Sequence, residues 1–296
     1  MRYKAKKSLG QNFLKSELAL RQIIEAGEIK KSDIILEIGP GRGALTEQLV
    51  ACSRQVIAVE KDRELFEFLK IKFQKEILSG QLNLVNEDIL KFDLESYKLK
   101  AKGYKLIANI PYNITGAILK KFLTEKIQPE LMVLMVQHEV AQRILAKDGK
   151  ESILSISVKA YGTPKMIAKV DKRYFSPAPK VNSAIIAIKN ISRKNFNSPL
   201  EEYPAPLFTK SGAGGGGNTS TPSRKRATPQ EGNLESKFWE IVKKGFAHKR
   251  KKLSGNLKGV CQSPPLTELG NKRAEDLSLS DWILLASTRV KNPRLE

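Results

Sequence analysis

The sequence predicts an α/β domain with a mostly parallel sheet, followed by a small α-helical domain. Two observations lead to this prediction. Up to residue 196, short apolar segments typical of buried strands alternate with segments of helical periodicity, and strands that alternate with helices form parallel sheets covered on both faces. From residue 234 to 296 the pattern is helical. We therefore expect residues 1–196 and 234–296 to form two domains.

The strands of the first domain are expected where apolar residues follow one another without a helical period. In chain order they fall within 33–38, 55–60, 82–90, 104–113, 131–137, 165–175 and 183–191. The helices are expected within 44–50, 63–77, 114–123, 138–145 and 152–162. The second helix illustrates the pattern, because Leu65, Phe66, Leu69 and Phe73 recur at helical spacing.

The segment 197–233 differs from both domains in composition. It contains five prolines, six glycines and many small polar residues, so it cannot bury enough apolar surface to offset the entropy of ordering. We expect a flexible linker there. After it, the Pro264–Pro265 pair is expected to break the helical pattern, and Ser278 and Ser280 are both placed to begin a last helix.

Charge is the most informative feature of the composition. Lys and Arg number 52 against 31 Asp and Glu, which gives a net charge of +21. Such a chain attracts polyanions, and salt weakens that attraction, so nucleic acid is the first candidate partner and an anionic membrane surface the second. A generally basic surface without a specific partner is the alternative. Residues 241–267 contain seven Lys or Arg and no acid, which concentrates part of the charge in the helical domain.

We expect neither a membrane span nor a secretory signal. No stretch approaches the roughly 20 apolar residues that a span needs, and the basic residues 1–15 have no apolar core behind them. Cys52 and Cys261 fit no metal or redox spacing. We therefore expect reduced thiols in a cytoplasmic protein.

A glycine-rich loop follows the first predicted strand and opens a helix. Gly39 and Gly41 allow a tight turn and a close approach to a ligand, and Gly43 allows the helix to pack closely on the sheet. Glu60 ends the next strand, where an acid can accept hydrogen bonds from ribose hydroxyls. The spacing Gly39-x-Gly41-x-x-Ala44 also matches a dinucleotide fingerprint, so NAD is one candidate ligand.

Three features favour a different nucleoside. The third glycine is at position 43, which makes the motif Gly-x-Gly-x-Gly. Glu37 precedes the loop, where a carboxylate would face the cationic end of a ligand rather than a pyrophosphate. Glu87 and Asp88 end the third strand, where an adenine amino group would lie. S-adenosylmethionine carries a sulfonium and an amine and fits these acids; a glycine turn without any ligand is the alternative.

With these residues assembled, the chain resembles the ribosomal RNA adenine dimethyltransferase family over essentially its whole length outside 197–233. The matching segments are GQNFL at 10–14, EIGPGRGALT at 37–46, VEKD at 59–62, NEDIL at 86–90, NIPYNI at 109–114, FSPAPKVNSA at 175–184, GFAHKRKKLSGNL at 245–257 and RAEDLSLSDWILLA at 273–286. One branch of the family modifies 16S RNA of the small subunit, and another, which confers antibiotic resistance, modifies 23S RNA. Ile110 mildly favours the second branch, whereas the long FSPAPKVNSA and RAEDLSLSDWILLA segments favour the first.

The resemblance implies a class I methyltransferase fold and transfer of methyl groups from S-adenosylmethionine to adenine N6. For the small-subunit branch, it implies dimethylation of two adjacent adenines near the 3′ end of 16S rRNA in the immature 30S subunit. We expect the protein to act as a monomer. The long linker departs from the family, whose two domains are usually joined briefly. Together with the loop and the acids above, the resemblance assigns cofactor contacts to Gln11, Asn12, Leu14, Glu37, Gly39, Gly41, Glu60, Asp88 and Asn109.

The segment Asn109–Tyr112 would carry out the chemistry. The exocyclic amine of adenine is a poor nucleophile because its lone pair is delocalised into the ring. The Asn109 side-chain oxygen and the Ile110 carbonyl can accept from its protons, which stabilises charge growing on the nitrogen. Pro111 stiffens the turn, Tyr112 can stack on the base, and Phe175 can cover its other face. No metal and no covalent nucleophile is required; a plain turn after a strand is the alternative.

The basic run Lys249, Arg250, Lys251 and Lys252 is expected to contact RNA phosphates, which position a substrate without specifying it. The target adenine must be exposed or flipped into the pocket. Two other classes of protein stay open. One is an NAD-dependent oxidoreductase, and the other is a nonenzymatic RNA-binding assembly factor that kept the fold. The intact Asn-Ile-Pro-Tyr motif argues against loss of activity.

Overall fold

The computed structural model describes residues 5–6, 9–101, 103–197, 231–260 and 264–287. The chain divides into two compact units, Met1–Ser192 and Arg193–Glu296. Residues 198–230, which make up most of the expected linker, lie outside the described residues, as does Cys261. The two ends of the expected linker are helical, since one helix ends at Asn197 and the next begins at Glu231.

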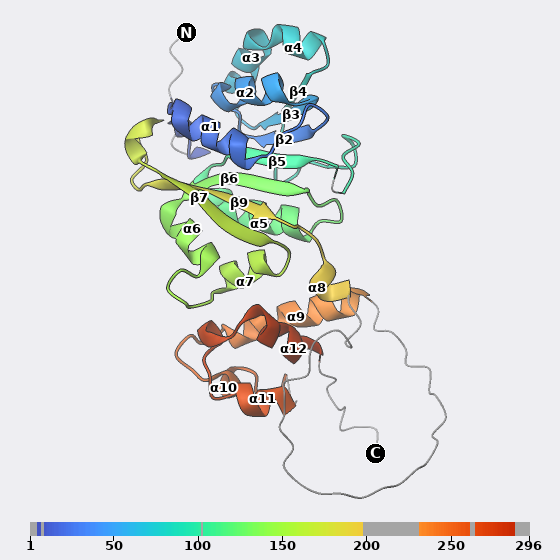
Figure 1. Cartoon of the computed structure of the whole chain (residues 1–296), viewed down its shortest axis with the longest axis vertical. Helices are drawn as coiled ribbons and strands as arrows, with labels where there is room; N and C mark the ends of the chain where they lie inside the picture. The colour runs from blue at the N-terminus through green and yellow to red at the C-terminus, as the bar shows by residue number, and fades with distance from the viewer. Residues whose placement is uncertain (1–4, 7–8, 102, 198–230, 261–263, 288–296) are drawn as a thin grey trace, which may run out of the picture. The chain divides into compact units, whose positions relative to one another are not determined.

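A seven-stranded sheet forms the centre of the first unit (Figure 1). In spatial order its strands are β4 (Leu82–Asn86), β3 (Gln55–Glu60), β2 (Ile34–Ile38), β5 (Lys105–Asn109), β6 (Leu131–Gln137), β9 (Ser183–Lys189) and β7 (Thr163–Val170). The pairs from β4 through β6 are parallel, whereas β9 is antiparallel to both β6 and β7. The register of β7 on β9 shifts between Met166 and Ala168, which marks a bulge. The predicted mostly parallel sheet is confirmed.

Helices cover both faces of this sheet. They are α1 (Glu17–Ala26), α2 (Ala44–Cys52), α3 (Arg63–Lys72), α4 (Gln74–Leu78), α5 (Thr115–Thr124), α6 (His138–Leu145) and α7 (Ile153–Lys159). Side chains along a strand point alternately to the two faces. Every residue from Leu131 to Val136 in β6 is buried, so both faces must be covered.

Side-chain caps and one glycine determine where the helices beside β2 and β3 begin. Asp62 begins α3, its carboxylate accepting from the backbone N–H of Glu64 (2.9 Å). Gly43 begins α2 in the left-handed region, with φ of 79°. A β-carbon at Gly43 would lie 2.5 Å from the ring of Phe73. Gly43 therefore allows α2 to approach the junction of α3 and α4, rather than the sheet as we expected.

A second, two-stranded sheet joins distant parts of the chain. Strand β1 (Phe13–Leu14) pairs antiparallel with β8 (Phe175–Ser176). Phe13 lies opposite Ser176, and Leu14 lies opposite Phe175. Beside this pair, the backbone N–H of Lys15 donates to the carbonyl of Tyr174 (2.8 Å). The ladder ties the segment before α1 to the connection between β7 and β9.

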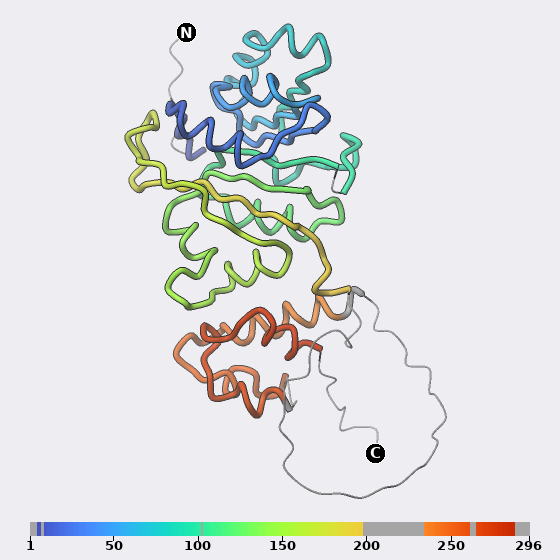
Figure 2. The backbone as a smooth tube through the Cα atoms, in the orientation of Figure 1, coloured from blue at the N-terminus to red at the C-terminus, as the bar shows by residue number. Residues whose placement is uncertain are grey.

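The second unit is a group of helices (Figure 2). They are α8 (Lys194–Asn197), α9 (Glu231–Gly245), α10 (Leu253–Asn256), α11 (Pro264–Leu269) and α12 (Leu279–Ser287). Trp282 of α12 is fully buried, and a β-carbon at Gly245 would lie 2.3 Å from its ring. Ser278 begins α12, as expected, by accepting from the backbone N–H of Asp281 (3.2 Å). The Pro264–Pro265 pair begins α11 instead of only breaking the pattern, because proline is tolerated in a first turn. In the described residues, no helix is both long and apolar enough to span a bilayer.

Candidate active site

A pocket of about 590 Å³ brings nearly all the predicted site residues together. Its walls come from the ends of β2 and β3, the segment after β4 and the segment after β5. The sheet order reverses between β2 and β5, and open α/β sheets bind ligands at such a switch point. Residues 9–15 complete the wall. All predicted catalytic and cofactor residues line this pocket except Phe175.

Hydrogen bonds from the glycine loop and from Asp62 hold the Glu60 side chain in place. Its carboxylate accepts from the backbone N–H groups of Gly41 (3.2 Å) and Asp62 (2.8 Å). These hydrogen bonds hold the glycine loop, in which Gly39 and Gly41 have φ of 63° and 62°. Burial raises the pKa of Glu60, and its backbone hydrogen bonds oppose that rise. An ionised carboxylate has about four acceptor sites, so Glu60 can still accept from a ligand hydroxyl.

Glu37 is buried at the end of β2 and 1% exposed. Its Oε2 has no hydrogen-bond partner among the described residues. Burial raises the pKa of Glu37 to about 8, and the nearby charge of Glu60 contributes to the rise. An unpaired buried carboxyl oxygen is costly. It is therefore a candidate partner for a cationic group in the pocket.

Both carboxylate oxygens of Asp88 already accept hydrogen bonds in the structure. One carboxylate oxygen accepts from the Lys61 ammonium (2.8 Å) and the other from the backbone N–H of Leu90 (3.0 Å). The Lys61 hydrogen bond holds the pKa of Asp88 below its usual range. A ligand amino group at this carboxylate would have to share it with Lys61. In the described part of the chain, no three His, Cys, Asp or Glu side chains are grouped as metal ligands.

The N-terminal wall of the pocket is held by a polar cluster that the sequence did not reveal. The Gln11 amide donates to Asp62 (2.9 Å), and Lys6 pairs with the same carboxylate (3.0 Å). The Asp62 side chain is fully buried. Gln11 lines the pocket, but its amide NH₂ is turned toward Asp62. This contact holds the segment in place, and the cofactor contact of Gln11 stays a prediction.

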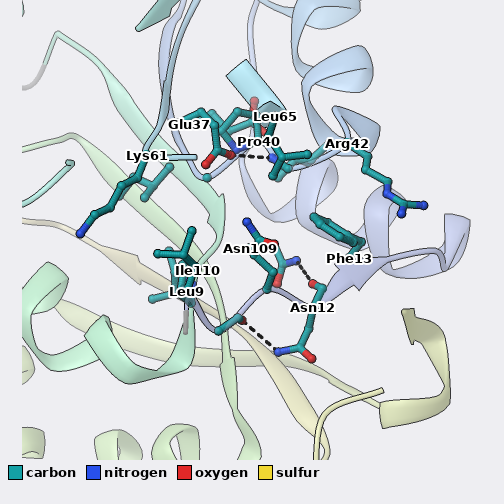
Figure 3. A pocket seen from close by; sticks show the side chains of 18 of the residues that line it. Leu9, Asn12, Phe13, Glu37, Pro40, Arg42, Lys61, Leu65, Asn109 and Ile110 are labelled. Carbon is teal, nitrogen blue, oxygen red and sulfur yellow. Dashed lines mark hydrogen bonds between the residues drawn. The ribbon is translucent and has the colours of Figure 1, made fainter. Parts of the chain in front are cut away.

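Asn109 is oriented by the N-terminal wall (Figure 3). Its Nδ2 donates to the backbone carbonyl of Asn12 (3.2 Å). The Asn12 side chain in turn donates to the carbonyl of Gly10 (3.0 Å). Only the NH₂ end of an amide can donate to a carbonyl, so this contact determines which end of the Asn109 amide is the acceptor. The oxygen of Asn109 is left available on the other arm of the amide.

Tyr112 is anchored by its hydroxyl. The ring is half-buried, lines the pocket beside Ile110 and Pro111, and carries a hydroxyl hydrogen-bonded to that of Ser183 (2.5 Å). Burial raises the pKa of Tyr112. Ser183 is fully buried at the start of β9. This contact spans 71 residues of sequence, so no local pattern could have revealed it.

Phe175 lies outside the pocket. Its side chain is 2% exposed and belongs to the same core cluster as Leu14. The neighbouring Ser176 lines the pocket instead. Stacking of Phe175 on a base therefore requires the ring to leave this core, and the role stays a prediction.

The basic run Lys249–Lys252 lies in the second unit, in the connection between α9 and α10. All four side chains are exposed. Lys252 donates to the side-chain oxygen of Asn271 (3.1 Å). The four cations form a compact exposed patch next to the short helix α10.

The sheet order and the acids around the glycine loop define a class I methyltransferase. Comparison with known sequences shows to which family within this class the chain is similar. The ribosomal RNA adenine dimethylase family matches residues 2–203. The chain is 36% identical to ribosomal RNA small subunit methyltransferase A of Dehalococcoides mccartyi (strain CBDB1), across 98% of this chain and 90% of that protein. The protein of the same name from Francisella tularensis subsp. novicida (strain U112) is 35% identical, across 96% of this chain and 97% of that protein.

The chain therefore belongs to the ribosomal RNA adenine dimethylase family. The prediction of an rRNA adenine dimethyltransferase is confirmed. Solved structures show the same fold. A dimethyladenosine transferase from Plasmodium falciparum matches with a TM-score of 0.67 at 24% identity, over 92% of this chain and 95% of that one. The 23S rRNA methyltransferase ErmE matches with a TM-score of 0.66 at 23% identity, over 93% and 98%.

Proposed function

We propose that the protein dimethylates N6 of two adjacent adenines near the 3′ end of 16S rRNA, in the immature 30S subunit, with S-adenosylmethionine as methyl donor. The observation that carries the adenine chemistry is the fixed amide of Asn109. The choice of 16S rRNA is supported by the relatives at 35–36% identity, which are named small-subunit methyltransferases. We further propose that the protein works in the cytoplasm as a monomer.

The residues of the pocket fit S-adenosylmethionine. The unpaired Oε2 of buried Glu37 suits a cationic group, Glu60 keeps acceptor sites for ribose hydroxyls, and Asp88 can accept from an adenine amino group. Leu14, Gln11 and Asn12 line the N-terminal side. The cofactor, when bound, supplies an electrophilic methyl group.

Asn109 and its neighbours would prepare the adenine amine. The Asn109 oxygen and the Ile110 carbonyl accept hydrogen bonds from the two N6–H groups, which turns the nitrogen lone pair toward the methyl donor and stabilises the charge that grows on nitrogen. Pro111 keeps the carbonyl in place. Tyr112, held by Ser183, supplies a flat face for the base.

The other roles follow the division of the chain. Residues 1–196 bind the cofactor, residues 197–233 connect, and residues 234–296 contact RNA through Lys249–Lys252. Phosphate contacts from this patch would add affinity and position the particle without reading its sequence.

The test is to incubate the protein with labelled cofactor and either immature 30S particles or 23S rRNA, and then to map the modified adenines. Dimethylation of two adjacent adenines near the 3′ end of 16S rRNA is expected. Modification of 23S rRNA alone would identify the resistance branch, which Ile110 favours. Binding of the 30S particle without methyl transfer would identify an assembly factor. Calorimetry should detect binding of S-adenosylmethionine and none of NAD.

A further inference from the structure

The connection between β7 and β9, residues 171–182, is drawn in yellow in Figure 1, and it carries an exposed aromatic ring. Tyr174 is 40% exposed. The guanidinium of Arg173 lies over this ring, 5.2 Å from its centroid, within the range of a cation–π interaction. An aromatic ring and a planar cation are therefore presented to solvent together.

The charge around Tyr174 suits an anionic partner. Residues 171–181 contain Lys172, Arg173 and Lys180 against the single acid Asp171, which lies 3.9 Å from the Arg173 guanidinium. Lys15, which follows β1, is exposed and adds a further cation; its backbone N–H donates to the carbonyl of Tyr174 (2.8 Å). Four cations against one acid complement a phosphate backbone.

The segment after Tyr174 leads to the reacting end of the pocket. Two residues further on, Ser176 lines the pocket and pairs with Phe13, next to the Asn12 carbonyl that orients Asn109. The connection then reaches β9, whose first residue, Ser183, anchors Tyr112. The exposed ring therefore lies in a segment that continues to residues beside Asn109 and Tyr112.

We propose that Tyr174 stacks, together with Arg173, on the base of the nucleotide next to the target adenine in single-stranded RNA. Lys15, Lys172 and Lys180 contact the phosphates of the same strand. Every base offers a flat face, and aromatic rings and arginine planes are the groups that hold splayed-out bases. This inference rests on the proposed function, because the pocket must receive an adenine for a neighbouring nucleotide to reach Tyr174.

The experiment measures binding of two short single-stranded RNAs at one salt concentration. The first contains two adjacent adenines. The second RNA is made in two versions: an abasic residue replaces the first adenine in one version and the second adenine in the other. The wild-type protein should bind the abasic RNA about tenfold more weakly in one of the two arrangements, the loss expected for one base–aromatic stack.

Tyr174→Ala should bind both RNAs with the same reduced affinity, because the stack is already lost. Tyr174→Phe keeps the ring and should discriminate as the wild type does. The matched control is Phe68→Ala, which removes a ring that is 47% exposed on α3 and does not line the pocket; it should also behave as the wild type. Unchanged affinity for S-adenosylmethionine would show that each variant is folded.

If Tyr174→Ala still discriminates tenfold against the abasic RNA, the stacking site is wrong and the proposed methylation is untouched. If the wild-type protein does not discriminate in either arrangement but methylates 30S particles, the stacking site is again wrong. If the wild-type protein neither binds these RNAs nor methylates 30S particles, the proposed function is wrong, and so is the stacking site that rests on it.

Discussion

Glu37 is a carboxyl group held out of water at the wall of the pocket. Burial raises its pKa from 4.5 to about 8. Between these values the folded protein holds a proton that the unfolded chain has released, so this residue makes the free energy of unfolding fall as pH rises. A cationic group bound beside Glu37 would stabilise the carboxylate and lower its pKa again.

Cofactor binding should therefore release a proton from Glu37 near neutral pH. The affinity for S-adenosylmethionine should rise as pH increases toward about 8, where the carboxyl ionises without help. Glu37→Gln should weaken binding and remove this pH dependence. Calorimetry in buffers with different ionisation heats counts the protons released. A wild-type protein that releases none would contradict the pairing of Glu37 with the cation.

Asn109→Ala should lower the rate of methyl transfer by about 10²-fold, the scale for losing one positioned polar group at the reacting atom. The patch Lys249–Lys252 lies in the other unit, so particle binding should be nearly unchanged. Methyl incorporation and particle binding are measured side by side. A variant that loses both to the same extent would show that Asn109 matters for folding rather than for the amine.

Ser183 and Tyr112 should act as one unit. Ser183→Ala and Tyr112→Phe should each slow methyl transfer by up to about tenfold, the worth of one hydrogen bond, and the double variant should be no slower than either single variant. Ser53→Ala is the matched control, since it removes a buried hydroxyl that bonds to the Leu49 carbonyl within the first unit. Additive effects would mean that the hydroxyl contact does not position the ring.

The residues proposed to contact the ligand were easier to identify from the sequence than the residues that hold them in place. Asn109, Glu37 and Glu60 stand at or next to the last residue of a strand, where the local sequence already indicates a site. Asp62 and Ser183 act through contacts between segments far apart in the chain. Such contacts exist only after folding, so a single sequence carries no spacing that identifies them.

At the level of elements, Gly43 and Gly80 distinguish two ways in which an added side chain destabilises the fold: backbone strain and overpacking. Both have positive φ, 79° and 76°. A β-carbon at Gly43 would lie 2.5 Å from Phe73, whereas one at Gly80 meets nothing within 4 Å. Gly80→Ala should lower the free energy of unfolding by about 1–2 kcal/mol through backbone strain. Gly43→Ala should lower the free energy of unfolding by about 1–3 kcal/mol more than Gly80→Ala, because the added methyl group overpacks against Phe73. Denaturant unfolding measures both values. If the two variants lose the same free energy of unfolding, α3 shifts freely to make room.

Long elements with a clear hydrophobic pattern were predicted well. Short elements, and those that form only by pairing with distant parts of the chain, were not. Four of the five parallel strands, β2, β3, β5 and β6, bury both faces, so their apolar runs were visible in the sequence. Strands β1 and β8 contain two residues each and exist only because they pair with one another. Helix α1 was not predicted, although Ser16 caps it by accepting from the Ala19 N–H (3.2 Å).

For the whole molecule, the question is whether a net charge of +21 acts through one patch or through the entire surface. Changing Lys249, Arg250, Lys251 and Lys252 to Ala should weaken binding to 30S particles and flatten its salt dependence by up to about 0.9 log unit per lost phosphate contact. Cofactor affinity should stay the same. The matched control removes four exposed lysines of the first unit: Lys70, Lys75, Lys100 and Lys126. If both variants weaken binding equally, the basic run is an ordinary part of a basic surface.

The bulge in β7 has a consequence for self-association. β7 is the last strand of the sheet, and an outer strand offers unpaired backbone groups to a second chain. Here Pro164 lacks an N–H, the bulge between Met166 and Ala168 disturbs the row of backbone groups, and the exposed Lys165 and Lys169 would meet their own copies in a paired edge. Each of these features opposes continuation of the sheet from molecule to molecule, so a protein with a long apolar sheet is guarded against fibrous aggregation along this side.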